Sequence, residues 1–118
     1  MTPPSTDTDG ATRVCRLTDL LPERGSGALI GEHRVALFRL ADDSVLAVQQ
    51  HDPFCGANVL SRGIVGDVDG VPTVTSPMYK QVWDLTTGAC LDAVGKEPVD
   101  LRTYPVLVVD GDVLVVTT

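Results

Sequence analysis

The length, composition and charge of the chain exclude several classes of protein. Its 118 residues suit one domain with one hydrophobic core, and its 11 Gly, 8 Pro and many Val residues favour short strands joined by turns. The formal net charge of −7, from 16 Asp and Glu against 9 Lys and Arg, argues against binding to nucleic acid or to an anionic membrane surface.

The first residues, MTPPSTDTDG, lack the basic and apolar segments of a signal peptide. No apolar run reaches the ~20 residues that a membrane span needs, so we expect a cytoplasmic protein. The polar residues 1–11 predict a disordered tail, because they contain no apolar anchor. Residues 12–118 are predicted to form one domain.

The predicted secondary structure is almost entirely β. Alternating apolar and polar residues indicate strands, and clusters of Gly, Pro and Asp indicate the turns between them. Short helical turns are expected within residues 17–25 and 57–63, and CLDAVGKEP (90–98) is expected to be a loop. The predicted strands cover residues 12–17, 28–30, 34–40, 44–50, 63–66, 71–76, 81–85, 100–109 and 113–118. Turn signals every ~8–12 residues predict an all-β sandwich or partial barrel.

Two proline-containing loops flank one predicted hairpin, DPFCG at residues 52–56 and SPMYK at residues 76–80. We expect them to lie side by side at one tip of the domain. His51 and Cys55 could offer a metal one nitrogen and one sulfur, but the second loop has no Cys or His. Because a structural or redox metal site needs four ligands, we expect none here.

The residues of the first loop suit simpler roles. Asp52 precedes a proline and is expected to form an Asx turn rather than to act in acid–base chemistry. Cys55 has only His51 nearby as an activating group, which favours an inert thiol over a nucleophile or a redox sensor. Cys15 and Cys90 lie in or beside predicted strands, where a free Cys is usually a small buried apolar residue.

The order of the segments resembles the Rieske ferredoxin-like domain over the whole chain after the tail. The resemblance is carried by VALFRL, SVLAV, DPFCGANVLSRGIVG, SPMYKQVWDLTTGACLD and YPVLVVDGDVLVV. A Rieske domain has Cys-x-His in the first loop and Cys-Pro-x-His in the second. Here Asp52 and Ser76 occupy the two Cys positions, and Phe54 and Tyr79 occupy the two His positions. Because a Rieske cluster needs thiolates and imidazoles, the resemblance implies the fold without the cluster.

Two stretches, DPFCGANVLSRGIVGD and SPMYKQVWDLTTGACLD, resemble more narrowly the small subunits of the bacterial assimilatory NAD(P)H-dependent nitrite reductase. That resemblance implies a partner, a large subunit that holds FAD, an iron–sulfur cluster and sirohaem and reduces nitrite to ammonium. It also implies that this chain carries no cofactor and no catalytic residue, and that it supports or positions the large subunit.

The side chains at the expected tip leave two interpretations open. Phe54 and Tyr79 would either fill the space that a cluster leaves or form an exposed aromatic contact patch. Arg62 and Lys80 are solvated cations by default, but their positions in or near loops make them candidate partner contacts together with the two aromatic residues.

Two other functions compete with that of an accessory subunit. One is a Rieske-type electron-transfer protein with a two-iron, two-sulfur cluster, which the replaced ligand positions oppose. The other is a stand-alone Rieske-like module that binds a different protein. Only the family resemblance opposes this second alternative.

Overall fold

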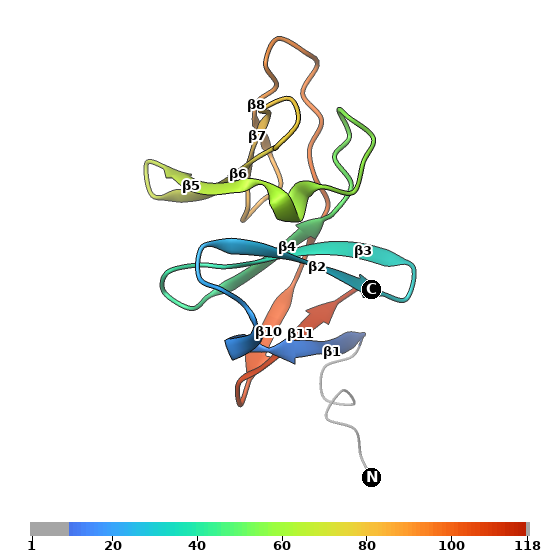
Figure 1. The fold of residues 1–118 in the computed structure, drawn as a ribbon, viewed down its shortest axis with the longest axis vertical. Helices are drawn as coiled ribbons and strands as arrows, with labels where there is room; N and C mark the ends of the chain where they lie inside the picture. Colours follow the sequence, from blue (N-terminus) through green and yellow to red (C-terminus); the bar gives the residue numbers. More distant parts are fainter. Residues whose placement is uncertain (1–9, 118) are drawn as a thin grey trace.

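The computed structural model describes residues 10–117, which form three antiparallel sheets (Figure 1). The strand orders are β1-β11-β10, β2-β3-β4-β9 and β5-β6-β7-β8. The strands are β1 (Ala11–Arg16), β2 (Arg24–Ile30), β3 (His33–Arg39), β4 (Val45–Gln49), β5 (Ile64–Val68), β6 (Val71–Thr75), β7 (Val82–Asp84), β8 (Cys90–Asp92), β9 (Thr103–Tyr104), β10 (Val106–Val109) and β11 (Asp112–Val116). Two 3₁₀ helices are present, η2 (Leu17–Asp19) and η3 (Leu60–Arg62).

The predicted all-β fold is confirmed. A disordered tail was predicted over residues 1–11, of which residues 1–9 lie outside the described residues. Ala11 belongs to β1 and pairs with Val116, so the domain begins earlier than the predicted residue 12. Among the described residues, no helix is both long enough and apolar enough to span a membrane.

The middle sheet supplies two hydrophobic cores, one on each face. In β3 the four residues 35–38 are all buried. Alternate side chains of a strand point to opposite faces, and here both faces of the sheet are covered. Val35 and Leu37 belong to one core, and Ala36 and Phe38 belong to the other. The first core also contains Leu20, Ile30, Val45, Ala47, Tyr104, Val113 and Val115. The second also contains Val48, Leu60, Val74, Trp83, Leu85 and Leu101, and it lies beneath the expected tip.

Strand β2 begins at Arg24, earlier than the predicted residue 28. Its Gly-Ser-Gly stretch is a weak strand signal, because these residues have low β propensity. Both glycines have a packing role: a Cβ at Gly25 would collide with the carbonyl oxygen of Ser61, and a Cβ at Gly27 would lie 2.7 Å from Gln50 Nε2. The glycines therefore allow η3 and Gln50, the residue that follows β4, to approach the strand closely.

Two further predictions were wrong in detail. Residues 90–98 do not form a loop throughout, because Cys90–Asp92 form β8 and pair with β7. The predicted strand over residues 100–109 is divided into β9, which pairs with β4, and β10, which pairs with β11. Pro105 separates the two parts, since a proline has no N–H to donate to a ladder.

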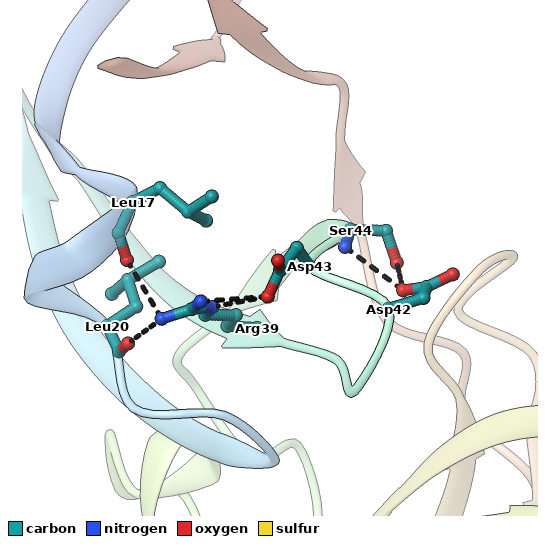
Figure 2. A network of polar contacts seen from close by, with 6 residues as sticks. All are labelled: Leu17, Leu20, Arg39, Asp42, Asp43 and Ser44. Atoms are coloured by element: carbon teal, nitrogen blue, oxygen red, sulfur yellow. Dashed lines mark hydrogen bonds and ion pairs between the residues drawn. The ribbon is translucent and has the colours of Figure 1, made fainter. Parts of the chain in front are cut away.

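Arg39, at the end of β3, joins three segments of the chain (Figure 2). Its Nη1 donates to the carbonyl oxygens of Leu20 at 2.8 Å and Leu17 at 3.4 Å. Its Nε and Nη2 donate to Asp43 Oδ1 at 3.1 and 2.8 Å. The guanidinium thus fastens η2 and the β3–β4 turn to the sheet.

We expect Arg39→Met to lower the free energy of unfolding by about 1–3 kcal/mol, because two carbonyl groups lose their charged donor while the apolar stem is kept. The free energy of unfolding of Arg39→Lys should lie between those of the wild type and of Arg39→Met. An ammonium group keeps the charge but cannot bond to the backbone carbonyl groups and to Asp43 at the same time. Urea denaturation of the three proteins measures the differences. A Lys variant as unstable as the Met variant would show that the segments are held by the fork of the guanidinium group, and that positive charge at this position does not suffice.

Asp112, at the start of β11, accepts hydrogen bonds from two guanidinium groups of β1. Its Oδ1 accepts from Arg13 Nε at 3.0 Å and from Arg16 Nη1 at 3.1 Å. The hydrogen bond from Arg13 is the largest cause that lowers the pKa of Asp112 below its ordinary value, and the bond from Arg16 adds to it. The lowered pKa in the folded state means that these bonds stabilise the fold only while Asp112 is ionised.

The contribution of Asp112 should therefore depend on pH. Because its pKa is lower in the folded than in the unfolded state, the stabilisation is present above about pH 4 and disappears as the pH falls through the folded-state pKa. We expect Asp112→Asn to melt below the wild type at about pH 7 and to melt with it at the acid end. A difference in melting temperature that does not change with pH would contradict this.

Candidate functional site

The first loop, residues 52–56, is built on Asp52, which follows an isolated bridge between His51 and Asn58. Asp52 Oδ1 accepts hydrogen bonds from the backbone N–H groups of Phe54 at 2.8 Å and Cys55 at 3.4 Å. The predicted Asx turn is confirmed. The backbone N–H of Gly56 closes the loop on the carbonyl oxygen of Asp52 at 2.8 Å.

The second loop, residues 76–80, has a related construction. Its ends meet where the N–H of Ser76 donates to the carbonyl oxygen of Gln81 at 2.8 Å. Ser76 Oγ accepts from the N–H of Met78 at 3.1 Å. Lys80 has a left-handed backbone with φ of +69°, which lets the loop turn into β7.

A side-chain hydrogen bond joins the two loops. Ser76 Oγ donates to Asp52 Oδ2 at 2.5 Å, and both residues are buried. The expectation that the loops lie side by side is therefore confirmed. The first carboxyl oxygen shapes one loop while the second binds the other loop, so Asp52 is the centre of the arrangement.

The two aromatic residues of the tip have different roles. Phe54 is partly buried and packs on Trp83, with ring centroids 5.8 Å apart. Trp83 is fully buried, as expected for a core residue. Tyr79 is 52% exposed. The first interpretation therefore holds for Phe54, which fills space between loop and core, and the second holds for Tyr79, which faces solvent.

A third loop, residues 93–99, completes this end of the molecule and was not predicted as part of the site. Trp83 Nε1 donates to the carbonyl oxygen of Val99 at 2.8 Å, which holds the loop against the core beneath Phe54. The register of β7 with β8 pairs Val82 with Asp92, so the second and third loops begin or end at the same place. No local signal reveals this, because the Trp83–Val99 contact depends on the fold.

Gln81 is a second residue that the sequence did not single out. It is fully buried, and neither its side-chain nitrogen nor its side-chain oxygen has a hydrogen-bond partner among residues 10–117. A buried amide without partners destabilises a protein by about 1–3 kcal/mol, so this feature sets the second loop apart.

The remaining candidate residues are spread over other surfaces. Arg62 lies in η3 and lines a groove of about 460 Å³ with Glu23, Arg24 and Ile64, and that groove contains no residue of the second loop. Its role in partner contact stays a prediction. His51 is exposed and Cys55 is partly buried.

The thiols of the described residues are not paired with one another. Burial is the main cause that raises the pKa of Cys15, and the negative charge of Asp19 raises it further. A thiolate is therefore disfavoured at Cys15. Cys15 was expected to be a small buried apolar residue, and it is partly buried and packs against the first core. The reactivity of Cys55 stays a prediction.

The residues of the two loops do not fit a Rieske cluster. Such a cluster takes two thiolates on one iron and two imidazoles on the other. In place of the thiolates stand a carboxyl and a hydroxyl group that are hydrogen-bonded to each other, Asp52 and Ser76. Phe54 has no donor atom, and the ring of Tyr79 faces solvent. Within residues 10–117, no group of three or more His, Cys, Asp or Glu side chains is arranged to hold a metal ion.

Comparison with known proteins places this geometry in a family. Residues 11–116 match the model of the Rieske-like [2Fe-2S] domain. The nitrite reductase (NADH) small subunit of Escherichia coli K12 is 39% identical over 99 residues, which cover 83% of this chain and 89% of that protein. A crystal structure of a Mycobacterium tuberculosis protein, assigned as an NADH-dependent nitrite reductase small subunit, has 45% identity and a TM-score of 0.84, and covers 92% of this chain and 95% of that one.

A third relative has a different organisation. The NAD(P)H nitrite reductase large subunit of Klebsiella oxytoca is 43% identical over 102 residues, which are 86% of this chain but only 10% of that protein. In Klebsiella oxytoca, therefore, a domain of this type is part of the large-subunit polypeptide. The match of fold and sequence over nearly the whole chain shows that the protein belongs to the Rieske-like domain family and, within it, to the nitrite reductase small subunits.

Proposed function

We propose that this chain is a cytoplasmic, non-catalytic small subunit of an NAD(P)H-dependent nitrite reductase and that it carries no iron–sulfur cluster. The likeness to small subunits over nearly the full length of both chains carries the subunit assignment. On this proposal, FAD, an iron–sulfur cluster and sirohaem stay on the large subunit, which reduces nitrite to ammonium. The small subunit stabilises or positions the large one.

The hydrogen bond between Asp52 and Ser76 supports the part of the proposal that concerns the cluster. A Rieske domain separates its two loops with iron and sulfide, whereas here two side chains bridge the loops directly at 2.5 Å. Phe54 adds an apolar contact to Trp83 below this bridge. The contacts that hold the tip together are thus those of a protein side-chain network, which needs no inorganic core.

The relative from Klebsiella oxytoca supports the choice of partner. A domain of this type shares a polypeptide with the rest of that large subunit. One copy of the domain therefore accompanies one large-subunit chain in that protein. We propose the same one-to-one ratio for this chain and a separate large subunit.

The test is to co-express the full chain, with an affinity tag, together with the large subunit from the same genome. Purification through the tag should recover the large subunit with its flavin and sirohaem absorbance, and the complex should reduce nitrite with NADH or NADPH. Recovery of the tagged chain alone, under conditions in which the large subunit is expressed and folded, would contradict the subunit assignment.

The cluster is tested separately on the isolated chain by iron and acid-labile sulfide analysis. We expect neither element in stoichiometric amount after reconstitution with iron and sulfide. A matched control restores the four ligand types with Asp52→Cys, Phe54→His, Ser76→Cys and Tyr79→His. Uptake of a cluster by this control but not by the wild type would support the proposal. A wild-type chain that takes up a cluster would contradict it.

A further inference from the structure

We infer that the second loop (76–80), the end of β8 and the third loop (93–99) form the surface that docks on the large subunit. The receiving face of the large subunit is expected to be apolar with carboxylates around it. This inference rests on the proposed function and deepens it by naming the docking face. The surface is called the tip patch below. It consists of Met78, Tyr79, Lys80, Leu91, Val94, Lys96 and Val99.

The tip patch exposes large apolar side chains. Met78, Tyr79, Leu91, Val94 and Val99 each have between 42% and 52% of their surface exposed. They lie at one end, because Val82 at the start of β7 pairs with Asp92 at the end of β8. Figure 1 shows the second and third loops, in gold and orange, at the end of the molecule away from the sheet β1-β11-β10. Apolar residues gathered in this way mark an interaction surface.

The backbone of the tip patch is strained at two positions. Of the other four non-glycine residues with positive φ among the described residues, three are Asp, a residue that tolerates this conformation, and the fourth is Glu23. Lys80 and Val94 are different, with φ of +69° and +55°. Val94 is β-branched, for which a positive φ is a genuine outlier. Such strain is found chiefly at functional sites.

The turn at Val94 shows what the free chain would prefer. The N–H of Lys96 donates to the carbonyl oxygen of Ala93 at 3.2 Å, and φ is positive at both central residues, Val94 and Gly95. A turn with two positive φ angles favours Asn-Gly over Val-Gly. An exposed valine at this place is therefore less favourable for the free chain than Asn would be, whereas on a partner it would enter an apolar pocket.

Gln81 adds a third, independent feature. Its amide is buried without a partner directly after the second loop, whose last residue is the strained Lys80. Exposed apolar residues occur elsewhere, for example Ile64 on β5 and Leu107 on β10, but these lie in paired strands without positive φ. Only at the tip patch, among the described residues, do exposure, strain and an unpaired buried amide coincide.

Charge identifies the chemistry of the partner. The chain has a net charge of −7 and contains only two lysines, Lys80 and Lys96, one in each loop of the tip patch. No salt bridge among the described residues involves either of them. Asp92 and Glu97 are exposed beside the tip patch as well, so the attraction is local. A carboxylate of the partner opposite each of Lys80 and Lys96 would pair with its ammonium group, which fixes the orientation of docking.

The experiment measures the affinity of the purified full chain for the immobilised large subunit, with three variants. Val94→Asn gives the turn its preferred residue, so the free chain should melt at a higher temperature while its affinity falls about tenfold or more. Lys80→Glu combined with Lys96→Glu should weaken binding and reduce its dependence on salt. Leu107→Ser is the matched control, an exposed apolar residue outside the tip patch, and should bind like the wild type.

Several outcomes would overturn the inference. If Val94→Asn and the double lysine variant both bind the large subunit as tightly as the wild type, the docking face lies elsewhere, while the proposed function stays intact. If Leu107→Ser weakens binding as much as the variants of the tip patch do, the docking face is likewise not confined to the tip patch and the inference fails. A chain that forms dimers which Val94→Asn dissolves, with unchanged affinity for the large subunit, would assign the patch to a second copy. A wild-type chain that does not bind at all would overturn the proposed function itself.

Discussion

Replacing Gly88 with alanine should lower the free energy of unfolding by about 3 kcal/mol or more, one of the largest effects of any single methyl group in this chain. Gly88 ends the turn after β7, with φ of +80°, and it is buried. A Cβ at this position would collide with the carbonyl oxygen of Leu101, whose own N–H donates to the carbonyl oxygen of Gly88 at 2.8 Å. The added methyl group would therefore push Leu101 out of the second core.

Gly95→Ala is the matched control. Gly95 has nearly the same backbone angle, with φ of +81°, but a Cβ there would meet no atom within 4 Å. The backbone term alone should make this variant less stable by about 1 kcal/mol. Urea denaturation of both variants separates the steric effect from the conformational one. Equal losses would show that the segment around Leu101 moves away without penalty.

Asp52→Ala should remove the link between the loops and lower the free energy of unfolding by about 2–4 kcal/mol. The hydroxyl group of Ser76 and the N–H of Phe54 both lose their acceptor, and the hydroxyl group is buried. Asp52→Asn should lower the free energy of unfolding less, because the amide has the same shape as the carboxyl group and keeps one acceptor oxygen. The same variants should loosen the second loop and thus also weaken binding to the large subunit.

A double-mutant cycle isolates the bond between the loops. Ser76→Ala, Asp52→Ala and the double variant are compared with the wild type by denaturation. Because the two side chains are in direct contact at 2.5 Å, we expect their coupling energy to exceed about 1 kcal/mol. A coupling energy near zero would mean that the rest of the tip, including the packing of Phe54 on Trp83, holds the loops without this bond.

Much of the fold could be predicted because its signals are local. The run VALF in β3 is apolar on both faces, which indicates a strand that lies between two layers. The closing hairpin of β10 and β11 is marked by two Val-rich runs around an Asp-Gly turn. The Asx turn at Asp52 is also local, since the carboxyl group bonds to backbone groups two and three residues on.

The failures occurred where distant residues decide the local structure. The Gly-Ser-Gly part of β2 has little strand propensity and forms a strand because it pairs with β3, while the absence of side chains at the two glycines leaves room for η3 and Gln50. β8 has only three residues, which is too short for a pattern of alternating side chains, and it is identified by its pairing with β7. The predicted strand over residues 100–109 is divided at Pro105 because its first part pairs with β4 of the middle sheet and its second part pairs with β11 of another sheet.

The sequence by itself determined the all-β class, the order of strands and loops, and the replacement of all four Rieske ligands by Asp52, Phe54, Ser76 and Tyr79. These are properties of residue type and spacing. Only the tertiary structure decided that Phe54 packs inward while Tyr79 faces solvent, and that the third loop joins the tip. The physical reason is that burial and strain depend on which segments meet in space, and the contacts between Trp83 and Val99 or between Asp52 and Ser76 join residues that are 16 and 24 positions apart.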